Sequence, residues 1–293
     1  GVRFPSHKRG APVAPTTGWD GSSQPHCVTL GAGRGSFPSV MLFPISDDDR
    51  HLLRPAWVTI TLVVANVLVF FYQLAHPAFT YAASVIPLEI VKGIDLVEPV
   101  LMRTGGQLVE IPQAPGPSPI YLTLLSAMFM HGGWAHLGGN LLYLWIFGDN
   151  VEHRFGHVRF LVFYVASGIA ASFAQIAVDP QSIIPNLGAS GAISGVLGAY
   201  LVLFPRNTVM AVFFFRIVSI PAVLVLGLWG VTQFFAGMGS LGDTGATGGV
   251  AYAAHIGGFV AGVVTGLWAR FSLKEEPETV FRGFYDTYRR GGR

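Results

Sequence analysis

Six long apolar runs constrain this chain more than any other feature. A helix needs roughly 20 residues to cross a hydrocarbon core of about 30 Å. Apolar runs cover residues 56–74, 137–147, 160–178, 190–204, 212–235 and 251–268, of which the second is short but carries no charge until Asp149. Only 12% of the residues are charged, and the mean hydropathy is +0.52. Because lipid cannot satisfy free backbone polar groups, the sequence predicts an all-α polytopic membrane protein, a bundle of six transmembrane helices.

Basic residues give the orientation, since Lys and Arg that flank spans stay on the cytoplasmic side. One set of loops and ends holds most of them: Arg50, Arg54, Arg154, Arg159, Arg206, Arg216, Arg270 and Lys274. The opposite loops hold only Lys92 and Arg103. We therefore expect both termini in the cytoplasm, with residues 75–136, 179–189 and 236–250 facing outward.

The chain divides into three parts. Residues 1–53 are expected to be a leader: residues 1–40 read as disordered and lack the apolar segment of a signal peptide, and the stretch from Met41, a possible true start, looks like a short cytoplasmic leader. Residues 54–271 form the expected membrane domain, and residues 272–293 a charged cytoplasmic tail. The single cysteine, Cys27, excludes an intramolecular disulfide, and a net charge of +2 argues against a nucleic-acid partner.

Ser190 is the first candidate for chemistry. It lies in the run Gly188-Ala189-Ser190-Gly191, where a loop-type sequence passes into an apolar run. A helix N-terminus favours negative charge, which suits an oxyanion. The alternative is a small residue that only permits close helix packing. Ser194, one turn later, is a rival nucleophile that lies deeper and lacks the amides of the helix end.

His255 is the second candidate, because an imidazole in a transmembrane helix needs a partner and titrates near neutral pH. It shares a stripe with Gly258, Gly262 and Gly266 that can approach another helix closely. If that helix is the one with Gly191, the serine and the histidine meet. The alternative is a structural histidine bonded to a backbone carbonyl.

A third cluster contains His131, His136 and Asn140. His136 and Asn140 are four residues apart, so they share a helix face and can both donate hydrogen bonds to an oxyanion. A zinc site of His131, His136 and His255 is disfavoured, because no HExxH pattern exists and the spans lack inner carboxylates. A transporter or channel is also disfavoured, since the polar groups gather at the outer third instead of lining a path.

Together these motifs resemble the rhomboid family of intramembrane serine proteases, from about residue 41 to residue 270. The matching motifs are Gly188-Ala189-Ser190-Gly191 before the fourth span, Ala254-His255 with Gly258 and Gly262 on the sixth, and His136 with Asn140 on the second. Two features differ from that family. Ser194 stands where a bulky aromatic residue often packs on the histidine ring, and the first outer loop lacks a Trp-Arg pair.

The resemblance implies a Ser190–His255 dyad that hydrolyses peptide bonds of transmembrane substrates through an acyl-enzyme. The amide of Ser190, with His136 and Asn140, then stabilises the oxyanion. Structural support is implied for His131, Glu152, Arg154, Gly188, Gly191 and Gly258. No metal or other cofactor is expected; the partners are membrane-protein substrates and the bilayer, and the expected location is a bacterial inner membrane. The alternative is a non-catalytic rhomboid-like protein that escorts membrane clients.

Overall fold

The computed structural model describes residues 42–47, 55–104, 107–213, 216–241 and 251–273. Residues 1–41 and 48–53 of the predicted leader and the tail beyond residue 273 lie outside the described residues, so what the sequence predicts for them remains a prediction. Residues 242–250, which precede the last span, also lie outside them.

Six helices of 14 to 22 residues overlap the six predicted spans. They are α1 (Trp57–Ala75), α5 (Trp134–Phe155), α6 (His157–Val178), α7 (Ser190–Leu203), α8 (Ala222–Leu241) and α9 (Tyr252–Ser272). Among the described residues, α1, α6 and α9 are long and apolar enough to cross a membrane by length and composition alone. The helical bundle agrees with the predicted fold class, whereas the number of spans remains a prediction.

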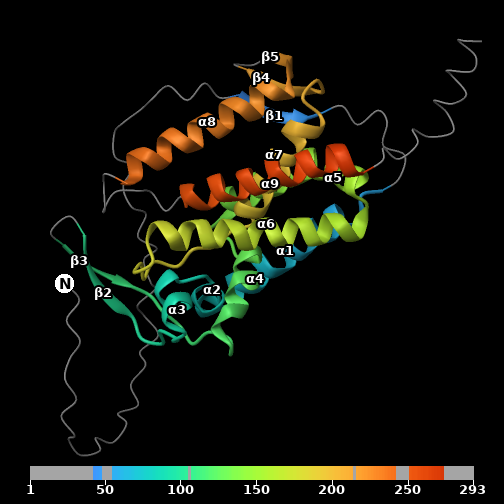
Figure 1. The fold of residues 1–293 in the computed structure, drawn as a ribbon. Helices are drawn as coiled ribbons and strands as arrows, with labels where there is room; N and C mark the ends of the chain where they lie inside the picture. Colours follow the sequence, from blue (N-terminus) through green and yellow to red (C-terminus); the bar gives the residue numbers. More distant parts are fainter. Residues whose placement is uncertain (1–41, 48–54, 105–106, 214–215, 242–250, 274–293) are drawn as a thin grey trace, which may run out of the picture. The chain divides into compact units, whose positions relative to one another are not determined.

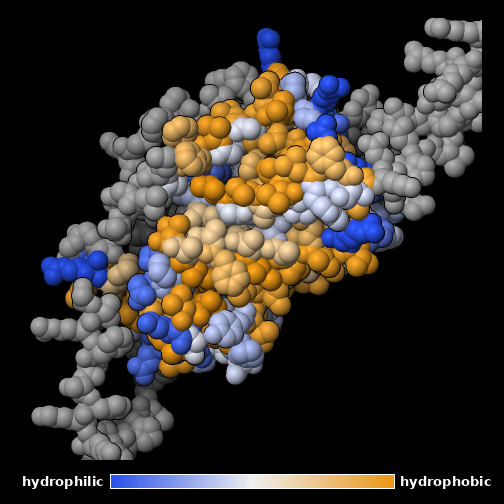
Figure 2. All heavy atoms as spheres, viewed as in Figure 1, coloured by the Kyte–Doolittle hydropathy of each residue, from blue (hydrophilic) through white to orange (hydrophobic). Residues whose placement is uncertain are grey.

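Shorter elements occupy the segment between α1 and α5. They are the helices α2 (Pro77–Ala82), α3 (Pro87–Lys92) and α4 (Thr123–Ser126), the 3-10 turns η1 (Ile120–Leu122) and η2 (Ala127–Phe129), and the antiparallel strands β2 (Val100–Thr104) and β3 (Gln107–Ile111). Figure 1 shows these elements on the side of α6 away from α8. Apolar residues cover the face of α6, α8 and α9 that is turned to the viewer in Figure 2, and hydrophilic residues gather at its margins.

The structure contains a three-stranded sheet that the sequence did not predict. Its strands lie at the predicted start of the fifth span and in the predicted leader. The fifth span was predicted to begin at residue 212, but β4 (Thr208–Phe213) and β5 (Arg216–Pro221) form an antiparallel hairpin there. The run is rich in β-branched and aromatic residues, which favour strands, and the charge of Arg216 interrupts it. The predicted start of the fifth span is therefore wrong, and the helix begins ten residues later.

The third strand of this sheet comes from the predicted leader. β1 (Leu42–Ser46) pairs antiparallel with β4, with Phe43 opposite Val212. The carboxylate of the next residue, Asp47, accepts hydrogen bonds from Tyr200 Oη at 2.5 Å and from Asn150 Nδ2 at 2.7 Å. Strand pairing and the buried Asp47 thus tie residues 42–47 of the predicted leader to the bundle.

Glycines bring α7 and α9 into backbone contact. A Cβ atom built on Gly258 would lie 2.0 Å from the carbonyl oxygen of Gly191, and one built on Gly262 would lie 1.9 Å from that of Gly195. In the opposite direction, a Cβ on Gly198 would lie 2.2 Å from the oxygen of Phe259. Only hydrogen fits at these positions, so the two helices pack more closely than side chains would allow. This approach brings the start of α7 next to the first turns of α9.

Candidate active site

Ser190 and His255 form a direct hydrogen bond. Ser190 Oγ lies 2.8 Å from His255 Nε2, although the two residues are 65 positions apart in the chain. Ser190 is the first residue of α7, and His255 lies in the first turn of α9. The glycine contact between the two helices therefore places a hydroxyl and an imidazole at the distance that proton transfer requires.

The loop before Ser190 is fixed by its backbone. Gly188 has a φ of +126°, which side chains other than hydrogen disfavour, and its N–H donates to Ala127 O at 2.9 Å. A short antiparallel bridge between Asn186 and Val85 anchors the loop further upstream. The first N–H groups of α7 have no partner within the helix, so they remain available to an oxyanion beside Ser190.

The imidazole of His255 is held from α8 and from its own helix. Its Nδ1 lies 2.7 Å from Gln233 Oε1. The ring of Trp229 lies 6.1 Å from the imidazole at 36°, and the ring of Tyr252 meets it edge-on at 6.5 Å. Sequence reasoning missed Gln233, whose one available signal was a lone amide in an otherwise apolar run.

His136 points a nitrogen at the same loop. Its Nδ1 accepts the N–H of Gly132 at 3.2 Å, so a neutral ring carries its hydrogen on Nε2. A Cβ atom built on Gly188 would lie 2.8 Å from that Nε2 and 3.5 Å from Ser190 Oγ. The Nε2–H group is thus a hydrogen-bond donor close to the serine, and any residue larger than glycine at position 188 would displace it.

Asn140 and Ser194 bond mainly within their own helices. Asn140 is buried and donates from Nδ2 to His136 O at 3.0 Å, which uses one of its two amide hydrogens. Ser194 is also buried, and its Oγ donates to Ser190 O at 2.6 Å. Of the two candidate nucleophiles, only Ser190 has its hydroxyl hydrogen-bonded to His255.

His131 is buried in the loop before α5. Its N–H donates to Gln73 Oε1 at 3.0 Å, its Nδ1 lies 3.3 Å from Phe129 O, and its ring meets that of His136 edge-on at 5.2 Å. Burial lowers the pKa of His131 to about 4, so the ring is neutral at pH 7. Within the residues that the structure describes, no three His, Cys, Asp or Glu side chains are arranged to hold a metal ion.

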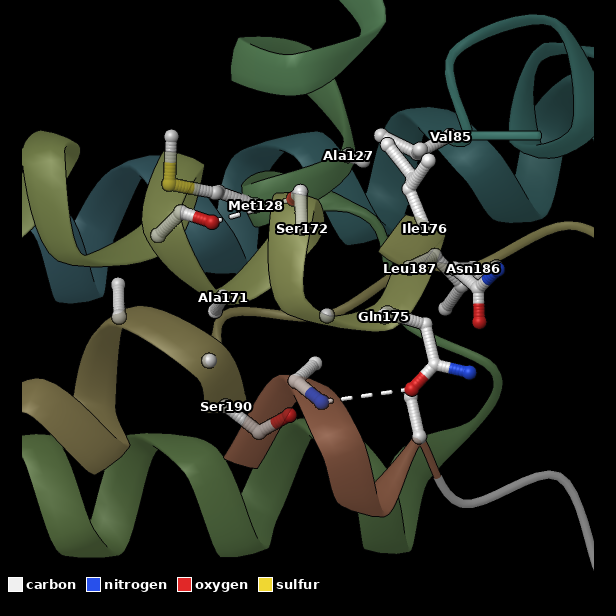
Figure 3. Close-up of a pocket in the computed structure, with 16 residues that line it drawn as sticks. Val85, Ala127, Met128, Ala171, Ser172, Gln175, Ile176, Asn186, Leu187 and Ser190 are labelled. Carbon is white, nitrogen blue, oxygen red and sulfur yellow. Dashed lines mark hydrogen bonds between the residues drawn. The ribbon is translucent and has the colours of Figure 1, made fainter. Parts of the chain in front are cut away.

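A small cavity adjoins Ser190. Its volume is about 40 Å³, enough for a water molecule, and it lies between α6, α7 and the loop before α7. Figure 3 shows Ser190 at one side of it and Val85 and Ile176 at the other. The Oε1 of Gln175 accepts the N–H of Ala254 at 3.3 Å, which holds the start of α9 against this cavity. Water thus has room beside the hydroxyl.

Glu152 and Arg154 bind the ends of other helices. The buried carboxylate of Glu152 accepts the N–H groups of Val58 and Thr59, at 2.9 and 2.7 Å, and therefore caps the start of α1. The guanidinium of Arg154 donates to Leu273 O at 2.9 Å, just past the end of α9. Both residues lie in the last turn of α5 and tie three helices together at the end of the bundle away from Ser190.

Comparison with known proteins identifies the family. The Rhomboid domain model matches residues 119–270. The chain is 37% identical over 146 residues to the Rhomboid protease GluP of Bacillus subtilis. The matched residues make up 49% of this chain and 26% of that protein. It is 30% identical over 159 residues to Rhomboid protein 1, mitochondrial, of Saccharomyces cerevisiae. The matched residues make up 53% of this chain and 44% of that protein.

A longer match joins the chain to an organellar relative. It is 27% identical over 266 residues to RHOMBOID-like protein 6, mitochondrial, of Arabidopsis thaliana, which is 81% of this chain and 75% of that protein. By contrast, the matched regions cover only 26% of the bacterial relative and 44% of the yeast relative, less than half of each. The domain model spans about half of the chain and includes the helices that hold Ser190 and His255. The chain is an integral membrane protein that belongs to the rhomboid family.

Proposed function

We propose that this chain is an intramembrane serine protease that cleaves peptide bonds in or near the transmembrane segments of other membrane proteins. The observation that carries the proposal is the hydrogen bond of 2.8 Å between Ser190 Oγ and His255 Nε2. A serine activated by an adjacent base is the arrangement of nucleophilic acyl transfer. GluP, which shares 37% identity with the matched region, is named a rhomboid protease.

In the first step Ser190 Oγ attacks the scissile carbonyl carbon, and its proton passes to His255 Nε2. The carbonyl oxygen becomes an oxyanion. The N–H of Ser190 at the start of α7 and the Nε2–H of His136 are the donors proposed to stabilise it, together with the second amide hydrogen of Asn140. Losing one such donor typically costs about 2.7 to 4 kcal/mol of transition-state stabilisation.

The tetrahedral intermediate then collapses, and His255 gives its proton to the leaving amine. The acyl group stays on Ser190 until a water molecule, deprotonated by the same imidazole, hydrolyses the ester. The cavity of about 40 Å³ beside Ser190 gives that water a place. A transmembrane substrate must unwind locally before attack, because a helical backbone is hydrogen-bonded and shielded, so residues of low helix propensity are expected at the cleavage point.

The relatives do not indicate which membrane holds the protein. They include a protein of a bacterium and mitochondrial proteins of yeast and a plant. This range gives no support to the bacterial inner membrane over an organellar one, and the predicted location stays without support.

Reconstitution tests the proposal. The purified chain is placed in liposomes with a fluorescent single-span reporter peptide that carries Gly and Ser near the outer end of its apolar segment. We expect cleavage by the wild type and by Ser194→Ala, and none by Ser190→Ala or His255→Ala. Unchanged cleavage by Ser190→Ala would refute the proposal. Binding of the reporter without cleavage by the wild type would favour the non-catalytic alternative.

A further inference from the structure

Gln233 holds the nitrogen of His255 that faces away from Ser190. The side chain comes from α8, and its Oε1 lies 2.7 Å from His255 Nδ1. Gln233 is partly buried, and its neighbours along α8, Phe234 and Phe235, are exposed and apolar. Its amide therefore sits on the inner face of a helix whose other face suits lipid. An amide at this depth needs a partner, and the imidazole supplies it.

With the amide oxygen of Gln233 toward the ring, the contact favours one tautomer of the imidazole. A neutral imidazole has one N–H and one lone pair. To take the proton of Ser190, His255 must present the lone pair at Nε2, so its hydrogen must be on Nδ1. The amide oxygen of Gln233 is only an acceptor, and it bonds the tautomer with hydrogen on Nδ1. With the amide in this orientation, the opposite tautomer would place two lone pairs against each other at 2.7 Å, and the amide would have to turn over and present its NH2 group to restore a hydrogen bond.

We propose that Gln233 is the positioning residue for the general base: it fixes the tautomer and the ring orientation of His255, the role that a carboxylate has in a Ser-His-Asp triad. This inference rests on the proposed function. It replaces the predicted dyad by a serine, a histidine and an amide, contributed by α7, α9 and α8. The amide dipole also stabilises the imidazolium that forms during the reaction, without placing a charge in an apolar helix.

The surroundings of the ring explain why an acceptor on α8 is needed. Ser194, one turn beyond the nucleophile, is too small to cover the imidazole and donates its hydroxyl to its own helix. Trp229, one turn before Gln233, lies 6.1 Å from the ring. Two side chains of α8 thus contact the base: Gln233 at the nitrogen that faces away from Ser190, and Trp229 at the ring. It follows that the base is aligned only while α8 lies against α9.

Three variants in α8 test the role of Gln233. Gln233→Leu removes the acceptor with little change in volume, and Gln233→Glu keeps an acceptor and adds charge. The matched control is Thr232→Val, because the adjacent Thr232 is exposed and donates to Trp229 O within its own helix. Each full-length variant is reconstituted with the reporter peptide, and kcat and KM are measured from pH 5 to pH 9.

We expect Gln233→Leu to lower kcat at least tenfold, with KM within about twofold, because the acceptor serves proton transfer and not substrate binding. Gln233→Glu should retain more activity than Gln233→Leu, and the acidic limb of its pH profile should move to higher pH because a carboxylate stabilises the imidazolium. His136 and Tyr252, the titratable neighbours of the ring on α5 and α9, are the same in every variant. Thr232→Val should match the wild type.

Two results would overturn this inference while leaving the protease proposal intact. One is a Gln233→Leu variant with wild-type kcat in a preparation where Ser190→Ala is inactive. The other is a Gln233→Glu variant whose pH profile has the same acidic limb as that of the wild type. This second result decides the question if Gln233→Leu melts at a lower temperature and is not folded. A wild-type chain that neither cleaves the reporter nor reacts at Ser190 would refute the protease proposal, and this inference with it.

Discussion

Replacement of Gly262 by alanine tests whether close helix packing aligns the site from a distance. Gly262 is two turns along α9 from His255 and contacts neither Ser190 nor the imidazole. A Cβ atom at this position would lie 1.9 Å from Gly195 O, 2.6 Å from its carbonyl carbon and 2.8 Å from its Cα. All three neighbours are backbone atoms, so no side chain can move aside.

The size of the effect follows from that distance. A carbon and a carbonyl oxygen need about 3.3 Å, so α7 and α9 must separate locally by about 1.4 Å. If half or more of this movement reaches the ends of the helices, the bond of 2.8 Å between Ser190 and His255 lengthens to about 3.5 Å or beyond, outside hydrogen-bond range. A misplacement of about 1 Å can lower the rate about 100-fold.

The assay compares kcat for the reporter peptide in Gly262→Ala with kcat in Gly227→Ala. A Cβ at Gly227, in α8, meets nothing within 4 Å. Alanine is the better helix former by about 1 kcal/mol, so Gly227→Ala should keep its activity and melt at the same or a higher temperature. A folded Gly262→Ala variant with wild-type kcat would show that the α7–α9 spacing does not control the site.

Three further predictions concern the surrounding framework. Gly188→Ala should lower kcat at least tenfold with little loss of KM, because the new Cβ would lie 2.8 Å from Nε2 of His136 in a backbone that has φ +126°; equal kcat for variant and wild type would contradict this. Glu152→Leu should lower the free energy of unfolding by about 2 to 5 kcal/mol, seen as a reduced Tm in detergent, since it removes the carboxylate that caps α1; an unchanged Tm would refute the cap. Burial raises the pKa of Glu89 to about 7, so the contribution of Glu89 to stability is full below about pH 4.5 and is lost as pH rises through 7. The Tm of Glu89→Gln should therefore rise relative to the Tm of the wild type between pH 5 and pH 8. A difference in Tm that is the same at every pH would contradict this.

The meeting of Ser190 and His255 could be predicted because small residues recur on the two helices at helical spacing. Gly191 and Gly195 in one run, and Gly258 and Gly262 in the other, share a period that places each set on one face. Faces without side chains can approach each other in the membrane, and the two polar residues lie at matching ends of these faces. Periodicity and polarity are both local properties, so the sequence alone is sufficient for this part.

Other contacts depend on tertiary structure that periodicity does not encode. Gln233 is 22 residues from His255, and its direction depends on how α8 packs on α9. The tautomer of His136 depends on the N–H of Gly132, whose position is set by the loop before α5. Glu152 is more than 90 residues from the helix end that it caps. The sequence analysis named His136 and Glu152 but not their partners, and it missed Gln233 altogether.

The hairpin of β4 and β5 was missed for a different reason. A short apolar run fits a buried helix or a strand equally well, and only the flanking residues distinguish them. Here Arg216 divides the run and Pro221 marks the change to helix. The leader strand β1 was missed because it pairs with this hairpin, so the first error led to the second.

The central claim is that His255 activates Ser190 as a nucleophile, and covalent labelling tests it most directly. The reconstituted chain is treated with a fluorophosphonate at pH 7.5, digested, and analysed by mass spectrometry to locate the adduct. We expect one adduct on Ser190, lost in Ser190→Ala, strongly reduced in His255→Ala and unchanged in Ser194→Ala. An adduct on Ser194, or labelling of Ser190 at the wild-type rate in His255→Ala, would contradict it.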